Sequence, residues 1–125
     1  MQKYEHRGLS INGKSFSALV ADSFSKRMIG LMFRKKLNKR ECMLFIFGSE
    51  GDQAIWMRNM LFPIDVVWLD SKMRVVDTVQ SIKPCKSILS CKEYHPRRAA
   101  KYIIEMVSGS VKANGINSRS RISVQ

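Results

Sequence analysis

Short runs in which hydrophobic and polar residues alternate make up most of the chain, and turn residues separate them. Phe16, Ala18 and Val20 share one face of such a run, which is typical of a β-strand. Asn12 and Gly13 precede this run and predict a hairpin, because both tolerate the positive φ angles of a type I′ turn. Continuous apolar runs predict further strands over residues 42–47 and 54–57, and short apolar or alternating runs predict strands over residues 64–69, 74–82, 102–107 and 121–124.

Signals for helices are few and short. Asp22 can cap a helix over residues 23–29 that ends at Gly30, and residues 110–114 predict one further helical turn. Residues 42–47 are apolar throughout, which indicates a strand that is covered on both faces. The chain therefore predicts a mainly β (β-rich α+β) fold, a small sandwich or barrel with one or two short helices over an open end.

The 125 residues contain no repeat, low-complexity tract or linker, so a single domain over residues 1–125 is expected. A chain of this length can bury enough surface to fold without a metal or a disulfide. No apolar run reaches the ~18 residues that span a bilayer. Residues 1–7 also lack the apolar stretch of a signal peptide, and we therefore expect a cytoplasmic protein.

Lysine and arginine outnumber aspartate and glutamate by 22 to 10, which gives a net charge of +12. Such a charge attracts nucleic acid, an anionic membrane face or an acidic protein, although it also fits a merely solvated cationic surface. No helix-turn-helix, finger or RNA-recognition motif is present, so any nucleic-acid binding is expected to be non-specific and salt-sensitive. The basic clusters are Arg34–Lys36, Lys39–Arg40, Arg97–Arg98 with Lys101, and Arg119 with Arg121.

Four segments of the chain carry recognisable motifs. The most specific joins Trp56-Met57-Arg58-Asn59 to Pro63-Ile64-Asp65. The others are Ala21-Asp22 with Arg27, Gly30-Leu31-Met32 and Arg34; Met43-Leu44-Phe45-Ile46-Phe47; and Tyr102 with Glu105, Gly109 and Gly115. In order and spacing these segments resemble the family catalogued as domain of unknown function 192, over residues 15–124.

The resemblance implies a compact β-rich domain, often found alone in bacteria and archaea, and it implies no established activity. The chain departs from the family pattern at Cys42, where glycine is usual, and at Met60, where threonine is usual. The second change removes a hydroxyl beside the most specific motif. A role that needs that oxygen is therefore not expected in this chain.

A candidate ligand site follows from polar residues in apolar surroundings. Asp65 begins an apolar strand, where it is either a structural acceptor of backbone N–H groups, a partner of an arginine, or a general base or anchor in a pocket. Asn59 can stabilise the turn before Pro63, and Arg34 could reach Asp65 or hold an anionic ligand. With the Trp56 ring as an aromatic wall, these side chains predict a site at one end of the β-domain.

Glu105 is the acidic residue of the apolar run 102–107, where it either points outward or meets Arg34 inside the domain. Glu105 and Asp65 could form an acid–base pair of carboxylates with separated pKa values. Arg58, beside Asn59, could likewise reach Asp65 or hold an anionic ligand, although a surface position is the favoured interpretation. No Ser/His/Asp or Cys/His triad and no glycine-rich phosphate loop is present.

The three cysteines call for different interpretations. Cys42 lies in an apolar run and is predicted to be a core residue. Cys85, Cys91 and His95 are residue types that bind zinc, but their spacing is wider than in most structural sites, so we predict no metal and no cofactor. In a reducing compartment two free thiols are expected at Cys85 and Cys91, with a reversible disulfide as the alternative. The family resemblance also implies a cysteine pair at this place.

Three functions follow as hypotheses. The first is a small-molecule-binding or accessory protein with a site at Arg34, Trp56, Asn59 and Asp65. The second is a hydrolase- or isomerase-like enzyme that uses Asp65, with Glu105 as its partner. The third is a basic adaptor for nucleic acid or an acidic protein.

Overall fold

Strands are the main elements of the computed structural model, which describes residues 3–125. The strands are β1 (Glu5–Ile11), β2 (Lys14–Ala21), β3 (Glu41–Gly51), β4 (Ile55–Trp56), β5 (Ile64–Leu69), β6 (Val75–Ile82), β7 (Glu93–Tyr94), β8 (Ala100–Val107) and β9 (Ile122–Val124). The helices are α1 (Phe24–Ile29) and α2 (Ser110–Ala113), with a 3-10 turn η1 (Ile88–Ser90).

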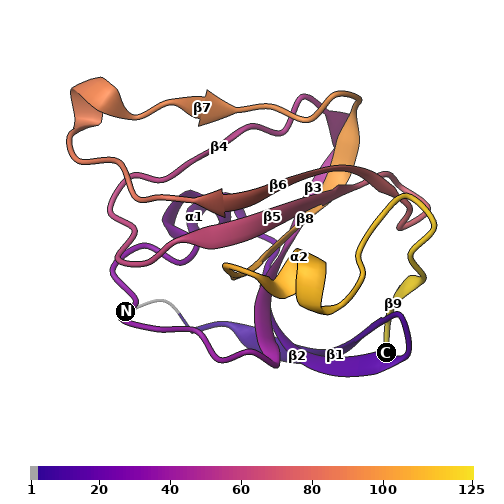
Figure 1. The fold of residues 1–125 in the computed structure, drawn as a ribbon. Helices are drawn as coiled ribbons and strands as arrows, with labels where there is room; N and C mark the ends of the chain where they lie inside the picture. Colours follow the sequence, from indigo (N-terminus) through magenta and orange to yellow (C-terminus); the bar gives the residue numbers. More distant parts are fainter. Residues whose placement is uncertain (1–2) are drawn as a thin grey trace.

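One sheet of seven strands organises the described chain, in the order β6-β5-β8-β3-β2-β1-β9 (Figure 1). The sheet is strongly curled, and β4 and β7 pair beside it as a separate two-stranded ribbon. The predicted mainly β class is confirmed. The sheet stays open, with β6 and β9 at its edges, because these two strands do not pair with each other.

The hairpin at the start of the chain is also confirmed. β1 and β2 pair antiparallel, and the pair closes at Ile11 opposite Lys14. Asn12 and Gly13 have φ angles of 51° and 83°, the left-handed conformation that a type I′ turn requires.

β2 and β3 are parallel neighbours, with Leu19 opposite Met43. Parallel strands cannot be joined by a tight turn, so the chain must cross over one face of the sheet between them. Residues 22–40 form this crossover, and α1 is its helix. The crossover places α1 over the sheet face that carries the candidate site.

α1 is held over the sheet by a few polar contacts rather than by its own packing, since none of its residues is buried. The N-cap is Ser23, whose hydroxyl accepts the Lys26 N–H at 3.3 Å, so the prediction that Asp22 caps the helix is wrong by one residue. Gly30 ends α1, as predicted, but its φ of 50° and ψ of −128° are not the left-handed helical conformation of a usual glycine cap. The Tyr4 hydroxyl donates to the Gly30 carbonyl oxygen at 3.2 Å.

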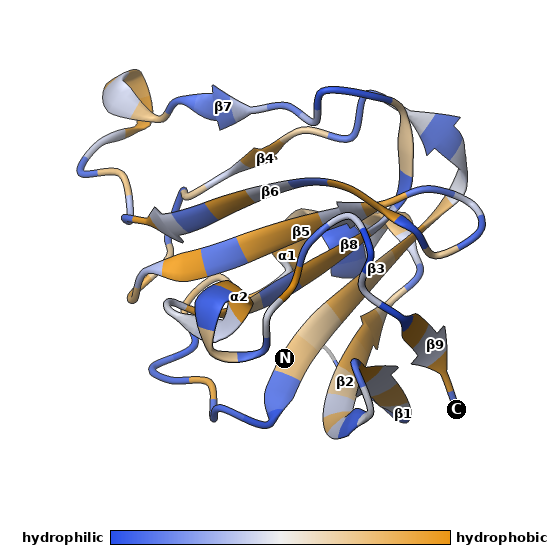
Figure 2. Ribbon diagram, turned by 45° about the vertical axis from the view of Figure 1, so that its right-hand side comes forward, coloured by the Kyte–Doolittle hydropathy of each residue, from blue (hydrophilic) through white to orange (hydrophobic). Residues whose placement is uncertain are grey.

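Hydrophobic side chains cover both faces of the sheet, and Figure 2 shows this character concentrated in β3, β5 and β8. α2 lies in front of the sheet in Figure 1 and α1 behind it. The core on the α1 side includes Leu19, Met43, Phe45, Val66, Trp68 and Ile103. The core on the α2 side includes Leu9, Cys42, Leu44, Val67, Ile104, Met106 and Val111.

Cys42 is a core residue, as predicted. Its side chain is fully buried on the α2 side, and burial raises the pKa of the thiol to about 12. A thiol in this state is inert at neutral pH, because the thiolate is the reactive form.

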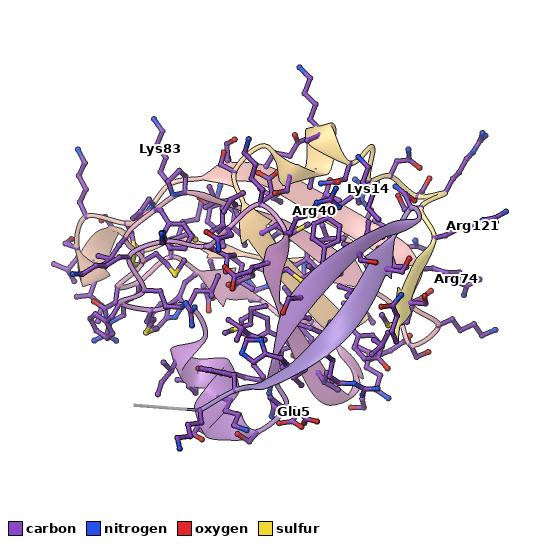
Figure 3. The ribbon with its side chains drawn as sticks, turned by 90° about the horizontal axis from the view of Figure 1, so that it is seen from below. Glu5, Lys14, Arg40, Arg74, Lys83 and Arg121 are labelled. Atoms are coloured by element: carbon purple, nitrogen blue, oxygen red, sulfur yellow. A yellow bond between two sulfur atoms is a disulfide. The ribbon has the colours of Figure 1, made fainter. Side chains whose placement is uncertain are left out.

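Basic side chains lie at opposite ends of the curled sheet. Figure 3 shows Lys14, Arg74 and Arg121 toward one end of the molecule and Lys83 toward the opposite end. The net charge of +12 is therefore spread over separate surfaces that can be tested independently.

Candidate functional site

A cavity of about 370 Å³ lies between the crossover and the sheet, and we call it the α1–β4 cavity. α1 and residues 30–32 cover it, β3 and β8 form its floor, and β4 forms one wall. Phe45 and Phe47 from β3 and Trp56 from β4 supply aromatic surface. A concave, mainly hydrophobic and aromatic site of this size suits a small organic molecule.

Glu105 is the carboxylate that lines this cavity. On β8 it stands opposite Met43 of β3 and Val66 of β5, so it shares their face of the sheet. Only 6% of the residue is exposed. An acidic side chain therefore lies on the floor of a mainly hydrophobic cavity.

The carboxyl of Glu105 has no ion-pair or hydrogen-bond partner among residues 3–125. Burial raises its pKa to about 8, because the charged form loses hydration and gains no compensating donor. At neutral pH the group is therefore mostly protonated. In this form it can donate one hydrogen bond and accept others from a ligand.

Two arginines lie at the rim of the cavity. Arg27 of α1 donates to the Ile46 carbonyl oxygen at 3.0 Å, and its guanidinium lies 5.1 Å from the centre of the Phe47 ring. Arg58 lies 5.4 Å from the centre of the Trp56 ring. These cation–π contacts orient both aromatic walls and bring positive charge to the opening.

Exposed apolar side chains of α1 also line the cavity. Phe24, Met28 and Ile29 are 73%, 52% and 39% exposed, although all three are of types that usually bury. Single exposed hydrophobic residues are ordinary, whereas a cluster of them around a cavity is unusual. This cluster therefore favours the binding of an apolar ligand.

Of the residues predicted for the site, the structure brings Trp56 and Glu105 to the cavity. Trp56 is held there by the pairing of β4 with β7, in which it stands opposite Glu93. Arg34, Asn59 and Asp65 do not line it.

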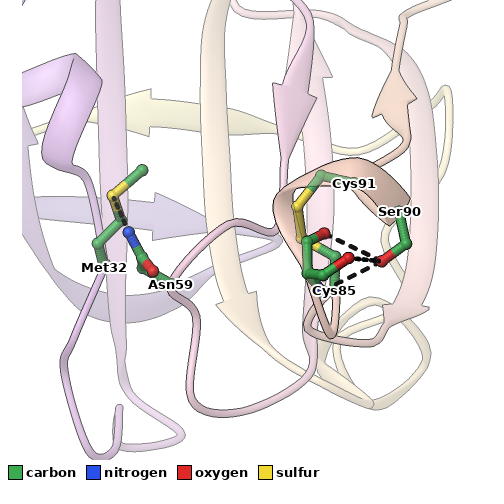
Figure 4. Close-up of a disulfide and its surroundings, with 6 residues drawn as sticks. Met32, Asn59, Cys85, Ser90 and Cys91 are labelled. Carbon is green, nitrogen blue, oxygen red and sulfur yellow. Dashed lines mark hydrogen bonds between the residues drawn. A yellow bond between two sulfur atoms is a disulfide. The ribbon is translucent and has the colours of Figure 1, made fainter.

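Asn59 is a turn residue. It has a φ of 58°, a conformation that asparagine adopts more readily than most residues, and its carbonyl oxygen accepts the Phe33 N–H at 2.9 Å. Its side-chain amide is directed at the sulfur of Met32, 3.9 Å away (Figure 4). Asn59 therefore ties the end of the crossover to the segment after β4.

Arg34 lies near Tyr4, not near either candidate carboxylate. Burial raises the pKa of the Tyr4 hydroxyl, and the positive charge of Arg34 partly offsets this rise. In the described chain no salt bridge joins Arg34 to Asp65 or Glu105. The expected inward pairing of Arg34 with either carboxylate is therefore absent from the described chain.

Asp65 is a structural acceptor of backbone N–H groups, the first of the alternatives predicted for it. It is fully buried, and its carboxylate accepts the backbone N–H groups of Ser81 at 2.8 Å, Gly109 at 3.1 Å and Val111 at 2.9 Å. It thus caps α2 from a distant strand, which suits a helix whose own N-cap, Gly109, has no side chain to do so.

Asp65 and Glu105 lie on opposite faces of the sheet. Asp65 pairs with Met106 across β5 and β8, whereas Glu105 pairs with Val66, and directly paired residues share a face. The proposed acid–base pair of these two carboxylates is therefore excluded by the register. Asp65 also does not line the cavity, and its carboxylate accepts three backbone N–H groups, which removes the basis for using it as a general base there.

Cys85 and Cys91 form a disulfide, with their Cα atoms 5.1 Å apart (Figure 4). The expectation of two free thiols is wrong, because the loop between the cysteines folds back in the η1 turn and brings them together. His95 bonds the Asp52 carboxylate through Nδ1 at 2.9 Å and lies 3.7 Å from Glu93.

The order of motifs, the curled sheet and the site can now be compared with known proteins. The profile of DUF192, described as Uncharacterized ACR, matches residues 8–124. The chain belongs to the DUF192 family. The match extends the predicted resemblance toward the N-terminus to include β1.

Relatives of this DUF192 chain are found among archaea. A UPF0127 protein of Thermococcus kodakarensis is 36% identical over 121 residues, which are 95% of this chain and 69% of the relative. A UPF0127 protein of Pyrococcus horikoshii is 41% identical over 103 residues, covering 81% of this chain and 78% of the relative. These names assign no activity.

Solved structures share the fold of the DUF192 chain. A chain from Sinorhizobium meliloti, provisionally described as a transcription regulator, has a TM-score of 0.89 at 23% identity and covers 99% of this chain and 97% of its own length. A protein of unknown function from Novosphingobium aromaticivorans has a TM-score of 0.85 at 20% identity, over 94% of this chain and 84% of its own. At these identities the likeness concerns the fold alone.

The DUF192 motif residues explain part of the cavity that the sequence did not reveal. Met60, which replaces the usual threonine, lines the cavity and makes this wall apolar. Arg27 was not predicted for the site, and for Arg58 a ligand-holding role was the less favoured alternative. Both arginines belong to the family motifs, which was the sequence signal that could have pointed to them. Phe45 and Phe47 are two residues apart on one strand, and this spacing indicates that they share a face.

Helices that are long and apolar enough to cross a membrane do not occur among residues 3–125.

Proposed function

We propose that this DUF192 domain binds a small, largely apolar molecule with one polar head group in the α1–β4 cavity. The observation that carries the proposal is Glu105, a buried carboxyl without a partner in the described chain that lines an aromatic cavity. A hydroxyl, amide or amine of the ligand would complete its hydrogen bonds. The Trp56 ring and the apolar side chains of α1 would contact the rest of the molecule.

The energetic argument is that Glu105 lowers the stability of the empty protein. Burial strips the charged carboxylate of part of its hydration, which is why the pKa of Glu105 rises, while its oxygens stay accessible from the cavity and open to a ligand. Perturbed ionisable groups in cavities mark functional sites more often than other positions do. A ligand that forms hydrogen bonds with Glu105 would offset this loss of stability, so molecules with a matching polar group would bind more tightly than others. The protein would then act as an accessory or carrier protein.

The test is a screen of small aromatic and aliphatic alcohols, amides and amines, followed by Trp fluorescence and amide chemical shifts. We expect hits to shift the Trp56 signal and the amides of β8 around Glu105, and E105L, which removes the hydrogen-bonding group, to weaken their binding about tenfold, as for one lost hydrogen bond. In W56F the remaining Trp68 is fully buried, so its fluorescence should not respond.

Two results would count against the cavity as a ligand site. One is the absence of shifts around Glu105 and Trp56 across the whole screen. The other is hits that E105L binds as tightly as the wild type, since the carboxyl would then take no part.

A second candidate is sequence-blind binding of nucleic acid in a basic groove at the other side of the sheet. The groove has a volume of about 750 Å³ and lies between the β1–β2 turn, the β5–β6 turn and residues 120–123. Lys72, Arg74 and Arg121 line it, and only Arg74 among them has a carboxylate partner, Asp70, at 2.9 Å. Free cations along a groove support contacts with phosphates.

For this candidate we expect K72Q/R121Q to bind random single-stranded RNA several-fold more weakly than the wild type at low salt. The slope of log affinity against log salt should fall in magnitude by about 1.4, as for two lost phosphate contacts on a single strand. K83Q/K86Q, which removes the same charge at the opposite end, is the control. Binding without salt dependence, or an equal loss in both variants, would rule out the groove.

The compartment stays a prediction. The cytoplasm was expected from the sequence, and the Cys85–Cys91 bond bears on it because structural disulfides persist mainly in oxidising compartments.

A further inference from the structure

The loop that the Cys85–Cys91 bond closes carries two exposed aliphatic residues at its tip. Leu89 is 96% exposed and Ile88 is 57% exposed. In Figure 2 the coil before β7 projects from the body of the molecule and shows hydrophobic colour. Exposed aliphatic side chains are unfavourable in water, and their transfer to an apolar environment lowers the free energy.

The tip is held in shape by local contacts. The disulfide joins the two ends of the loop, and the Ser90 hydroxyl donates to the Ser87 carbonyl oxygen at 3.0 Å while accepting the Ser87 N–H at 3.1 Å (Figure 4). The η1 turn between them presents Ile88 and Leu89 outward. Because the loop is already ordered, insertion of its tip into another phase would require little further ordering.

Positive charge surrounds the aliphatic tip. Lys83 and Lys86 are exposed, and Lys92 lies over the Tyr94 ring at 5.0 Å from its centre. No acidic residue occurs in residues 83–92, and the next one, Glu93, lies 3.7 Å from His95. The tip therefore combines hydrocarbon with a cationic collar, the combination that interfacial membrane segments use.

We propose that this tip docks the protein on the surface of an anionic phospholipid bilayer. Ile88 and Leu89 would enter the boundary between headgroups and acyl chains, and the lysines would meet the phosphates, to which juxtamembrane lysines are attracted. The net charge of +12 would draw the whole molecule to such a surface. The proposal is independent of the ligand in the α1–β4 cavity.

A bilayer fits the tip better than a protein partner does. The tip is a projection with aliphatic and lysine side chains, whereas hot spots of protein interfaces favour tryptophan, tyrosine and arginine and deplete lysine. Flexible lysine stems can extend toward phosphates while their methylene groups stay in apolar surroundings.

The experiment measures co-sedimentation of the oxidised full chain with vesicles. One set contains phosphatidylglycerol and phosphatidylcholine in equal amounts, and the other contains phosphatidylcholine alone. We expect binding to the anionic vesicles that weakens with salt, and little binding to the neutral ones. L89S should lower the partition coefficient about tenfold, whereas L89F should keep it near the wild-type value, because only the apolar surface matters.

Charge variants separate the tip from general attraction. K83Q/K86Q should weaken binding to anionic vesicles at least severalfold, and K72Q/R121Q, with the same loss of charge at the other end, should weaken it much less. All variants change exposed residues, and equal urea midpoints would show that they fold alike. Wild-type protein that ignores anionic vesicles, L89S that binds like the wild type, or equal losses in the two charge variants would each overturn the proposal; the first would leave the tip as a contact for a protein.

Discussion

Replacement of Asp65 by alanine is expected to lower the free energy of unfolding by about 3–5 kcal/mol, a large share of the ~5–15 kcal/mol that stabilises an ordinary domain. The carboxylate accepts three backbone N–H groups inside the protein, from Ser81, Gly109 and Val111. Alanine would leave these donors without an acceptor, and each buried unpaired donor carries a cost. Urea unfolding followed by circular dichroism measures the loss.

The loss should be large because the three donors belong to two otherwise separate parts of the chain. Ser81 lies in an irregular stretch of β6, where the pairing with β5 shifts register, and has a φ of 54°. Gly109 and Val111 begin α2. Removing the carboxylate would therefore loosen the edge of the sheet and the helix together.

A graded series keeps the Asp65 prediction testable if the alanine variant does not fold. D65N retains one oxygen acceptor and should lose about half as much. D52A removes an aspartate whose side chain is 68% exposed and should lose less than ~1 kcal/mol. A D65A protein as stable as D52A would contradict the structural role given to this residue.

Wild-type protein is expected to lose stability relative to E105Q as the pH rises from about 5 to about 8, by roughly 3–4 kcal/mol in total. The pKa of Glu105 is about 8 in the folded protein, well above the ordinary value of 4.5. As the pH rises, Glu105 loses its proton at a lower pH in the unfolded chain than in the folded protein. Between the two pKa values the unfolded chain is therefore ionised while the folded protein keeps its proton. Stability from the group is therefore complete below the unfolded pKa and is lost as the pH rises through the folded one.

The pair of proteins isolates this effect, because other titrating groups are common to both. Unfolding midpoints in urea at several pH values give the difference directly. E93Q, at an exposed glutamate, is the matched control and should follow the wild type. A constant difference between wild type and E105Q would mean that Glu105 titrates normally, and the cavity would lose its unusual carboxyl.

Local signals in the sequence predicted the elements well. Asn12 and Gly13 specified the first hairpin, and the apolar run 64–69 gave β5 at its observed bounds. These features depend on neighbouring residues and on periodicity. β7, by contrast, is two residues long and exists through its pairing with β4, which no local pattern indicates.

The candidate site was harder to predict because it depends on register. The donors to Asp65 lie 16, 44 and 46 residues away in the sequence, so a carboxylate in an apolar strand could not be assigned to structure or function beforehand. The same is true of Glu105, whose face follows only from its pairing with Val66. A shift of one residue would have exchanged their positions.

The parallel pairing of β2 with β3 has an evolutionary consequence. Because of this pairing, residues 22–40 form a crossover connection over one face of the sheet. This connection covers the cavity, and the central strands form its floor. Substitutions in the connection, which buries none of its helix, need not disturb the pairing of the strands beneath. The residues that cover the cavity can therefore change while the paired strands that form its floor stay the same.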